Sequence, residues 1–294
     1  MSPRRRGWAL VALVTIACDR SPPPSSPPPL LAEPSTLRGT VRASGSSALQ
    51  PLLNLAKERF ERLHPEVNIE IAGGGSKKGL VDVASGAVDL GSSDIPAPQD
   101  LAQLLQDHPV AILVYAPMAQ RGPETEGISA LSLEQLRGVY SGRITRWSEL
   151  GGAERPIVVI NRGAGSGTRQ VFAQVVMDGQ PFLETQTEDN SGALVAKLTR
   201  TPGAISYLSL AFESEALQTF SLRVDGQIVT PTPQAVRDGQ WPLTAVAHVY
   251  TKGAPSPLAA AFLAYLRSAE LEAPIAALGG FLPLREQVQA ELSP

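Results

Sequence analysis

The chain has 294 residues, of which 43% are hydrophobic and 18% are charged, and its formal net charge is −3. This composition is typical of a folded globular protein and excludes an intrinsically disordered chain. A slightly acidic chain has no general electrostatic attraction to nucleic acid or to acidic membranes, so we expect no nucleic acid partner. Its length suffices for one large domain or two smaller domains with cores of their own.

The N-terminus reads as a secretory signal. Three arginines at 4–6 precede an apolar run at 8–17 that is too short to span a bilayer. The only cysteine, Cys18, follows directly, and this arrangement resembles the lipobox of bacterial lipoproteins, although Thr15 departs from the usual pattern. We therefore expect a lipoprotein signal peptide at 1–17 and lipidation of Cys18. An ordinary cleaved signal with a chance cysteine is the alternative.

Residues 18–37 are rich in proline and serine and include the stretch SPPPSSPPPLLAEP. Such sequences adopt extended polyproline II structure and form semi-rigid spacers of about 3.1 Å per residue. After a lipidated cysteine, this segment is expected to be a tether. The folded part would then lie on the periplasmic side of a bacterial membrane, attached to it only through the lipid anchor.

From residue 38 onward, short apolar runs alternate with amphipathic segments. Strands are predicted at 40–44, 67–72, 87–92, 110–117, 156–161, 204–210 and 245–253. Helices are predicted at 50–64, 78–86, 98–107, 132–142, 166–177, 191–199 and, as one long closing helix, 256–272. The alternation of strand and helix predicts an α/β protein with a parallel sheet.

Four of the predicted helices follow loops of glycine and serine. The loops lie at 44–49, 73–79, 162–168 and 189–194. Serine is a good helix N-cap, so capping alone explains any single loop. Four such loops in one chain favour helix N-termini that converge on one anion, because backbone N–H groups and the helix dipole attract negative charge there.

Motifs of phosphate chemistry and catalysis are absent from these loops. GGGSKKG lacks the Gly-Lys-Ser/Thr of a P-loop, GAGSG lacks the full dinucleotide fingerprint, and none contains the G-x-S-x-G of a nucleophile elbow. The three histidines are far apart in sequence and suggest no metal site. We predict a protein without catalytic residues, metal or cofactor.

Several segments, in order, resemble the substrate-binding proteins of bacterial phosphate ABC importers, the PstS type. They include ASGSSALQPL, IAGGGSKKGL, VDLGSSDIPAP, LSLEQLRGVYSGRITRWSEL, VVINRGAGSGTRQVF, TPGAISYLSL and VAHVYTKG. The resemblance implies an α/β periplasmic-binding-protein fold of type II, with two lobes, two hinge crossovers and the ligand between the lobes. It also implies a monomer that binds inorganic phosphate with high affinity and delivers it to a membrane-embedded permease.

The resemblance further implies a division of the folded chain into three segments. One lobe would comprise 38–113 and 244–294, and the other 114–243. The crossings would lie near YAPM, at 115–118, and WPLT, at 241–244.

By position, the resemblance places eight residues at the phosphate. They are Ser47, Ala48 through its backbone N–H, Ser76, Asp94, Arg162, Ser166, Gly167 and Thr168. Lys77 and Lys78 stand where small residues are common in the family. We expect them to be solvated, and the alternative is that they raise the local positive potential.

Asp94 would decide which anion binds. Phosphate keeps a proton at neutral pH and can donate it to a carboxylate, whereas sulfate is fully deprotonated and would face an unpaired acceptor. Arg162 would fork to the anion and to Asp94. Two alternatives remain: a binding protein for another oxyanion, such as sulfate or molybdate, and an exported hydrolase of phosphate esters. Asp94 argues against the first, and the lack of a nucleophile with a base argues against the second.

Overall fold

The computed structural model describes residues 37–284. The expected signal peptide at 1–17, Cys18 and almost all of the expected tether lie outside the described residues, as does the chain beyond residue 284. None of the helices within 37–284 combines the length and the apolar character that crossing a membrane requires.

Within residues 37–284, the main sheet has nine strands. Seven follow the order β2-β1-β3-β13-β4-β9-β6, and β10 and β14 each pair with β4 beside this path. The strands are β1 (Gly39–Gly45), β2 (Val67–Ala72), β3 (Leu90–Ser93), β4 (Leu105–Gln120), β6 (Val158–Val159), β9 (Ala204–Ser209), β10 (Leu217–Thr219), β13 (Thr244–Lys252) and β14 (Phe281–Leu282).

The pairing within this sheet is mixed, so the expectation of a parallel sheet is wrong for its centre. β1 is parallel to β2 and β3, and β6 is parallel to β9. In contrast, β13 is antiparallel to β3 and β4, and β4 is antiparallel to β9. Alternating strands and helices describe only consecutive elements. They could not reveal that a strand near the end of the chain inserts between two early ones.

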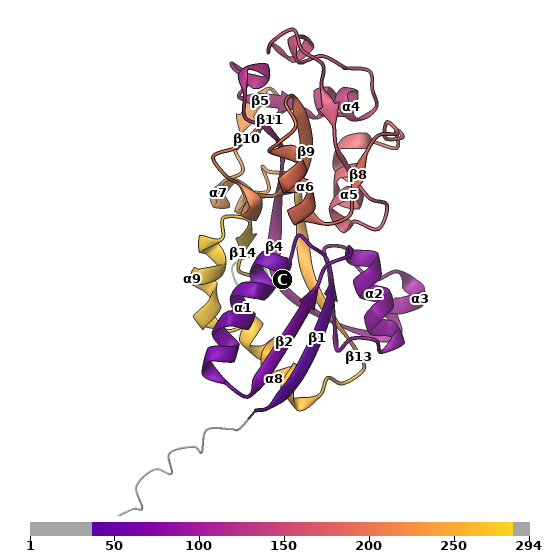
Figure 1. Ribbon diagram of the computed structural model, residues 1–294, viewed down its shortest axis with the longest axis vertical. Helices are drawn as coiled ribbons and strands as arrows, with labels where there is room; N and C mark the ends of the chain where they lie inside the picture. The colour runs from indigo at the N-terminus through magenta and orange to yellow at the C-terminus, as the bar shows by residue number, and fades with distance from the viewer. Residues whose placement is uncertain (1–36, 285–294) are drawn as a thin grey trace, which may run out of the picture. The chain divides into compact units, whose positions relative to one another are not determined.

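Strand β4 changes partners in its middle. Its first part pairs with β13 as far as Val114, which lies opposite Thr244. Its second part pairs with β9, starting at Tyr115, which lies opposite Ser209. Figure 1 shows β4 running from the elements around β1 and β2 toward those around β9. One strand is therefore shared between two groups of elements.

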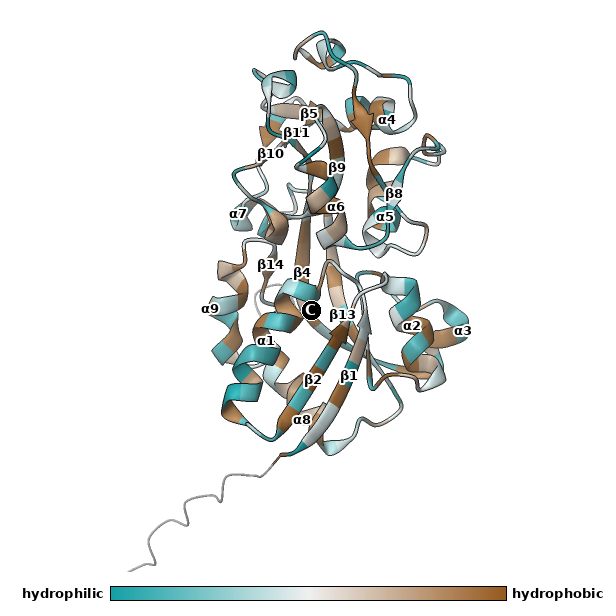
Figure 2. Cartoon of the chain, in the orientation of Figure 1, coloured by the Kyte–Doolittle hydropathy of each residue, from teal (hydrophilic) through white to brown (hydrophobic). Residues whose placement is uncertain are grey.

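Helices pack around the part of the sheet that contains β1 to β3 and the start of β4. They are α1 (Gln50–Leu63), α2 (Ser76–Ser85), α3 (Gln99–Ala102), α8 (Pro257–Leu266) and α9 (Ala269–Ala277). Helix α3 contacts β4, and α9 contacts β14 and α1. Hydrophobic and hydrophilic bands alternate along α1 and β2 in Figure 2, because each element buries only one face. Phe60 of α1 meets Phe262 of α8 in a T-shaped pair with ring centroids 5.4 Å apart, which joins the two helices through the core.

The remaining elements surround β9. The helices are α4 (Leu133–Tyr140), α5 (Gly167–Phe172), α6 (Ser191–Leu198) and α7 (Pro233–Arg237), and a π-helical turn, Ala173–Met177, continues α5. Two small sheets hold β5 (Ala130–Ser132), β11 (Ser221–Val224) and β12 (Gln227–Val229), and β7 (Asn161–Arg162) and β8 (Thr187–Glu188). The buried rings of Phe172 and Tyr207 stack at 4.0 Å, which fixes α5 against β9.

Two helix predictions fail for identifiable reasons. The helix expected at 98–107 ends at Ala102, and β4 begins at Leu105 because pairing with β13 overrides the local helical pattern. The closing helix expected at 256–272 is interrupted, because Ser268 adopts an extended conformation and starts α9 as a separate helix.

Candidate functional site

The loop between β1 and α1 buries Ser47 and Ala48. Neither residue caps α1, because the N-cap position is held by Leu49, which forms no side-chain capping bond. The Ala48 backbone N–H donates to Ser46 Oγ at 3.2 Å. The burial of the Ser47 hydroxyl is therefore not explained by helix capping. The Ala48 N–H, in contrast, already has an acceptor inside the loop.

Ser76 opens α2 but is turned toward the end of β3. The N-cap of α2 is Gly75, with a φ of 91° that favours glycine. The Ser76 hydroxyl donates to Asp94 Oδ1, and the Ser76 oxygen accepts from the Asp94 backbone N–H at 3.1 Å. Both side chains are buried. This double contact fixes the second loop to Asp94.

The Asp94 carboxylate accepts hydrogen bonds from hydroxyl groups of three separate segments. Ser76 donates to Oδ1, while Tyr115 and Thr168 donate to Oδ2 at 2.7 and 2.8 Å. Only 2% of Asp94 is exposed. An ionised carboxylate offers about four acceptor positions and no donor, so these three bonds leave about one position open. The carboxylate is thus arranged to accept one further proton donor.

Arg162 lies in β7, opposite Glu188 of β8. Its Nε donates to the Glu188 carbonyl at 3.3 Å, and its Nη2 donates to Ser47 Oγ at 3.2 Å and the Asp189 carbonyl at 3.3 Å. Its Nη1 is buried and has no hydrogen-bond partner among residues 37–284. Burial lowers the pKa of Arg162, and the charge of Asp94 opposes that shift. A buried donor without an acceptor is costly, so Nη1 marks a place for an anionic acceptor.

The third loop brings Ser166 and Thr168 to the start of α5. Ser166 Oγ accepts from the Arg169 backbone N–H at 3.3 Å, so this serine does cap its helix. Thr168 lies in the first turn, is buried and donates to Asp94. The first backbone N–H groups of a helix have no intrahelical acceptor. The turn therefore supplies donors next to the Asp94 carboxylate.

Gly167 packs directly against the same carboxylate. A Cβ added to Gly167 would lie 2.1 Å from Asp94 Oδ1 and 2.5 Å from Ser76 Oγ. No side chain fits at these distances without movement of both neighbours. The glycine is therefore required for close approach rather than for an unusual backbone angle.

The four loops of glycine and serine meet, as the sequence led us to expect. The Lys77 backbone N–H donates to the Gly165 carbonyl at 3.2 Å, which joins the second loop to the third. The Ser191 backbone N–H donates to Ser47 Oγ at 2.9 Å, which joins the fourth loop to the first. Hydroxyl and N–H donors from four loops are thus gathered around Asp94 and Arg162.

One expected contact is missing. Arg162 and Asp94 form no ion pair within 4.0 Å in the described part of the chain, so the expectation that the guanidinium forks to Asp94 is wrong. The backbone carbonyls of Glu188 and Asp189, together with Ser47 Oγ, accept from the guanidinium instead. Hydroxyl groups, rather than a cation, satisfy the carboxylate.

Sequence reasoning missed Tyr115 and Ser191. Tyr115 lies inside an apolar strand, where a tyrosine gives no signal of polar contact. Ser191 lies in the fourth glycine and serine loop, but nothing in the sequence of that loop distinguishes this serine. In the structure Tyr115 binds Asp94, and the Ser191 hydroxyl lies 3.0 Å from the Ser47 hydroxyl.

The two lysines of the second loop have different surroundings. Lys78 Nζ forms an ion pair with Asp82 at 2.5 Å, and about half of its side chain is exposed. Lys77 is exposed and takes part in the loop contacts through its backbone. Both ammonium groups are thus outside the buried network around Asp94.

The histidines take part in ordinary packing and pairing. His248 Nδ1 lies 2.9 Å from Asp107, and His108 Nε2 lies 3.0 Å from Thr251 Oγ1. No group of three or more His, Cys, Asp or Glu residues within 37–284 is arranged to hold a metal ion.

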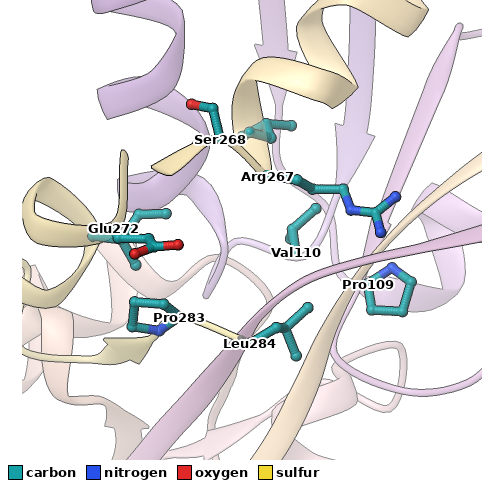
Figure 3. Close-up of a pocket in the computed structure, with 9 residues that line it drawn as sticks. Pro109, Val110, Arg267, Ser268, Glu272, Pro283 and Leu284 are labelled. Carbon is teal, nitrogen blue, oxygen red and sulfur yellow. The ribbon is translucent and has the colours of Figure 1, made fainter. Parts of the chain in front are cut away.

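A pocket of about 500 Å³ lies elsewhere, between β4, the junction of α8 and α9, and the end of the described chain (Figure 3). Its lining is mainly apolar and comprises Pro109, Val110, Leu266, Arg267, Ser268, Glu272, Ile275, Pro283 and Leu284. None of the eight predicted site residues lines it. Its opposite charges, on Arg267 and Glu272, do not favour an oxyanion.

Comparison with known proteins identifies the family of this chain. The family model of the PBP superfamily domain matches residues 32–270. The phosphate-binding protein PstS of Bacillus subtilis (strain 168) is 37% identical over 251 residues, which cover 84% of this chain and 82% of that protein. The PstS of Staphylococcus epidermidis is 22% identical over 74% of this chain and 70% of its own length.

Solved structures are similar as well. One, from Clostridium perfringens, is described as a substrate-binding protein of a phosphate ABC transporter with bound phosphate. It has a TM-score of 0.77 and 25% identity, and covers 84% of this chain and 100% of its own. A phosphate transport receptor from Vibrio cholerae has a TM-score of 0.63 and 20% identity, and covers 82% of this chain and 99% of its own. At 20% identity, the similarity to the Vibrio cholerae structure shows the fold alone.

Proposed function

This chain belongs to the PstS-type phosphate-binding proteins of the PBP superfamily, and we propose that it binds inorganic phosphate outside the cytoplasmic membrane and supplies it to an ABC importer. It is a binding protein rather than an enzyme. The observation that carries this proposal is the buried Asp94 carboxylate, which is surrounded by hydroxyl donors and has about one acceptor position open.

The donors around Asp94 suit the oxygens of phosphate. In our proposal the hydroxyls of Ser76 and Thr168 turn from Asp94 to the anion, because a hydroxyl can rotate toward a new acceptor. Arg162 donates through Nη1, and Ser47 adds a hydroxyl. The N–H groups of Gly167 and Thr168 and Ser166 at the helix cap add further donors. The Ala48 N–H completes the eight residues if the Ser46 hydroxyl, its present acceptor, turns away from it.

The Asp94 carboxylate then favours an anion that carries a proton. Both forms of phosphate at neutral pH keep at least one P–O–H group, which donates to the carboxylate in a charge-assisted bond. Sulfate has no such proton and would place an oxygen lone pair against the carboxylate. Discrimination by an unpaired buried group is a strong form of selectivity. The alternative of a sulfate or molybdate receptor is therefore disfavoured.

We further propose the two lobes and their hinge. One lobe comprises 38–113 and 244–294, and the other 114–243. The change of partners along β4, after Val114, and the start of β13 at Thr244 support these boundaries. Ligand closure by bending at two such crossings is a common device in binding proteins.

Export and anchoring complete the proposal. The protein is extracytoplasmic, in keeping with its family. We infer in addition that residues 1–17 are removed, that Cys18 carries a lipid, and that residues 18–37 tether a monomer to the membrane, where it meets the permease.

Calorimetry on the chain without residues 1–17 tests the binding function. Titration with phosphate should give a saturable single site, and titration with sulfate should give much weaker binding. Tight sulfate binding would replace the proposal with another oxyanion receptor. A chromogenic phosphate ester should remain uncleaved, and its hydrolysis would support the enzyme alternative.

A further inference from the structure

Tyr115 occupies an unusual position in the fold. It is the first residue of β4 that pairs with β9, directly after the last residue that pairs with β13. Its phenol points to Asp94 and donates to Oδ2 at 2.7 Å. Only 2% of the residue is exposed. A residue at the change of strand partners is therefore linked directly to the carboxylate of the candidate site.

Both backbone groups of Tyr115, its N–H and its carbonyl, form hydrogen bonds with the second crossing, residues 241–244. Its N–H donates to the Leu243 carbonyl at 2.9 Å, and its carbonyl accepts from Trp241 Nε1 at 2.9 Å. The Trp241 side chain is itself buried. Because these two bonds fix the backbone and the ring has only two side-chain torsions, the position of the phenol oxygen is well defined.

Tyr115 differs in its location from Ser76 and Thr168, the other two residues whose hydroxyl groups donate to Asp94. Ser76 and Thr168 lie at the starts of helices in the glycine and serine loops, where an anion can take their hydroxyls. Tyr115 comes from the sheet, and its hydroxyl proton prefers the plane of the ring. Burial raises the pKa of Tyr115 well above its usual value, and the neighbouring Asp94 raises it further. The phenol therefore stays protonated and remains a donor.

We propose that Tyr115 is a positioning residue that sets the preference of the site for protonated oxyanions over fully deprotonated ones. It does so by holding Asp94 Oδ2, so that a lone pair of Oδ1 stays directed at the anion. Without the phenol, the carboxylate turns about its terminal torsion and the bond to a P–O–H group loses its geometry. This inference rests on the proposed binding of phosphate.

Tyr115→Phe removes only the hydroxyl and tests the inference. We expect the ratio of phosphate affinity to sulfate affinity, measured by competition calorimetry, to fall about tenfold. Tyr140→Phe is the matched control, because Tyr140 is fully buried and its hydroxyl has no hydrogen-bond partner within the described chain. The control should keep the wild-type ratio. Equal losses for both anions in Tyr115→Phe would indicate a purely structural role and overturn the inference.

A double variant separates positioning from other effects. In an Asp94→Asn background the group that Tyr115 orients is gone, so adding Tyr115→Phe should leave the ratio unchanged. A further fall of the same size in that background would contradict the inference. If Tyr115→Phe does not fold, Trp241→Phe removes the indole N–H that holds the Tyr115 carbonyl. It should lower the ratio to a smaller extent, and an unchanged ratio would count against the inference.

The wild type distinguishes two kinds of failure. If it does not bind phosphate, or binds sulfate equally well, the proposed function itself is wrong. If it prefers phosphate and Tyr115→Phe keeps that preference, only the role of Tyr115 is wrong.

Discussion

Arg162 Nη2 donates to the hydroxyl oxygen of Ser47 at 3.2 Å, although 115 positions separate the two residues in the chain. The same oxygen accepts from the Ser191 backbone N–H at 2.9 Å. A hydroxyl oxygen has two lone pairs, so both are used and only the proton of Ser47 remains to be donated. Ser47 is thereby set as a donor, either to Ser191 Oγ or to an anion. The contact also ties residue 162 to the loop after β1.

Removing the Arg162 guanidinium should weaken the binding of every oxyanion. Arg162→Ala deletes the unpaired Nη1 donor and the positive charge nearest to Ser47 in the site. We expect a loss of about 2–5 kcal/mol in phosphate binding, the usual cost of breaking a buried charged interaction. Arg200→Ala is the control, because Arg200 is exposed at the end of α6. Calorimetry that showed equal phosphate affinity in both variants would exclude Arg162 from the site.

A single methyl group should disturb the site at Gly167. Gly167→Ala places a carbon against Asp94 Oδ1 and Ser76 Oγ, so we expect weaker phosphate binding and a loss of roughly 1–3 kcal/mol in folding stability from overpacking. Gly165→Ala, in the same loop, meets no atom within 4 Å and should change stability by less than about 0.5 kcal/mol. Equal denaturation midpoints and affinities for the two variants would contradict the close packing.

The lipid anchor can be tested by metabolic labelling. Cells that express the full chain and grow with labelled palmitate should produce labelled protein, and Cys18→Ala should abolish the label, because the chain contains no other cysteine. Label that persists in the variant would contradict lipidation at this residue.

Closure of the two proposed lobes should be visible in solution. Small-angle scattering of the chain without residues 1–37 is expected to show a smaller radius of gyration at saturating phosphate than without ligand. Sulfate at the same ionic strength is the control. If calorimetry confirms binding and the radius does not change, the hinge account is wrong.

Much of the fold could be predicted because most elements follow local patterns. The apolar spacing of α1 and the apolar run of β4 describe buried faces, and both elements exist. The position of β13 between β3 and β4 could not be predicted, since it depends on pairing between distant segments. The same pairing shortened α3, because ladder hydrogen bonds outweigh a weak local preference.

The candidate site was predictable to the extent that its residues lie in glycine and serine loops. The loops themselves indicated where an anion could bind, and the resemblance to the PstS type, rather than loop composition, singled out Ser47, Ser76 and Thr168 within them. Tyr115 could not be predicted, because an apolar strand hides one polar contact. The contact depends on the fold, which brings the middle of β4 close to Asp94 at the end of β3, with β13 between the two strands.

The central claim is that the Asp94 carboxylate selects phosphate by accepting its proton, and Asp94→Asn tests it most directly. The amide keeps the size of the side chain and can present N–H to the anion, so phosphate should still bind while sulfate gains relative to phosphate. Asp107→Asn is the control, since Asp107 pairs with His248 outside the site. Competition calorimetry on the three proteins should show a lower phosphate-to-sulfate affinity ratio for Asp94→Asn alone. An unchanged ratio in that variant would contradict the account.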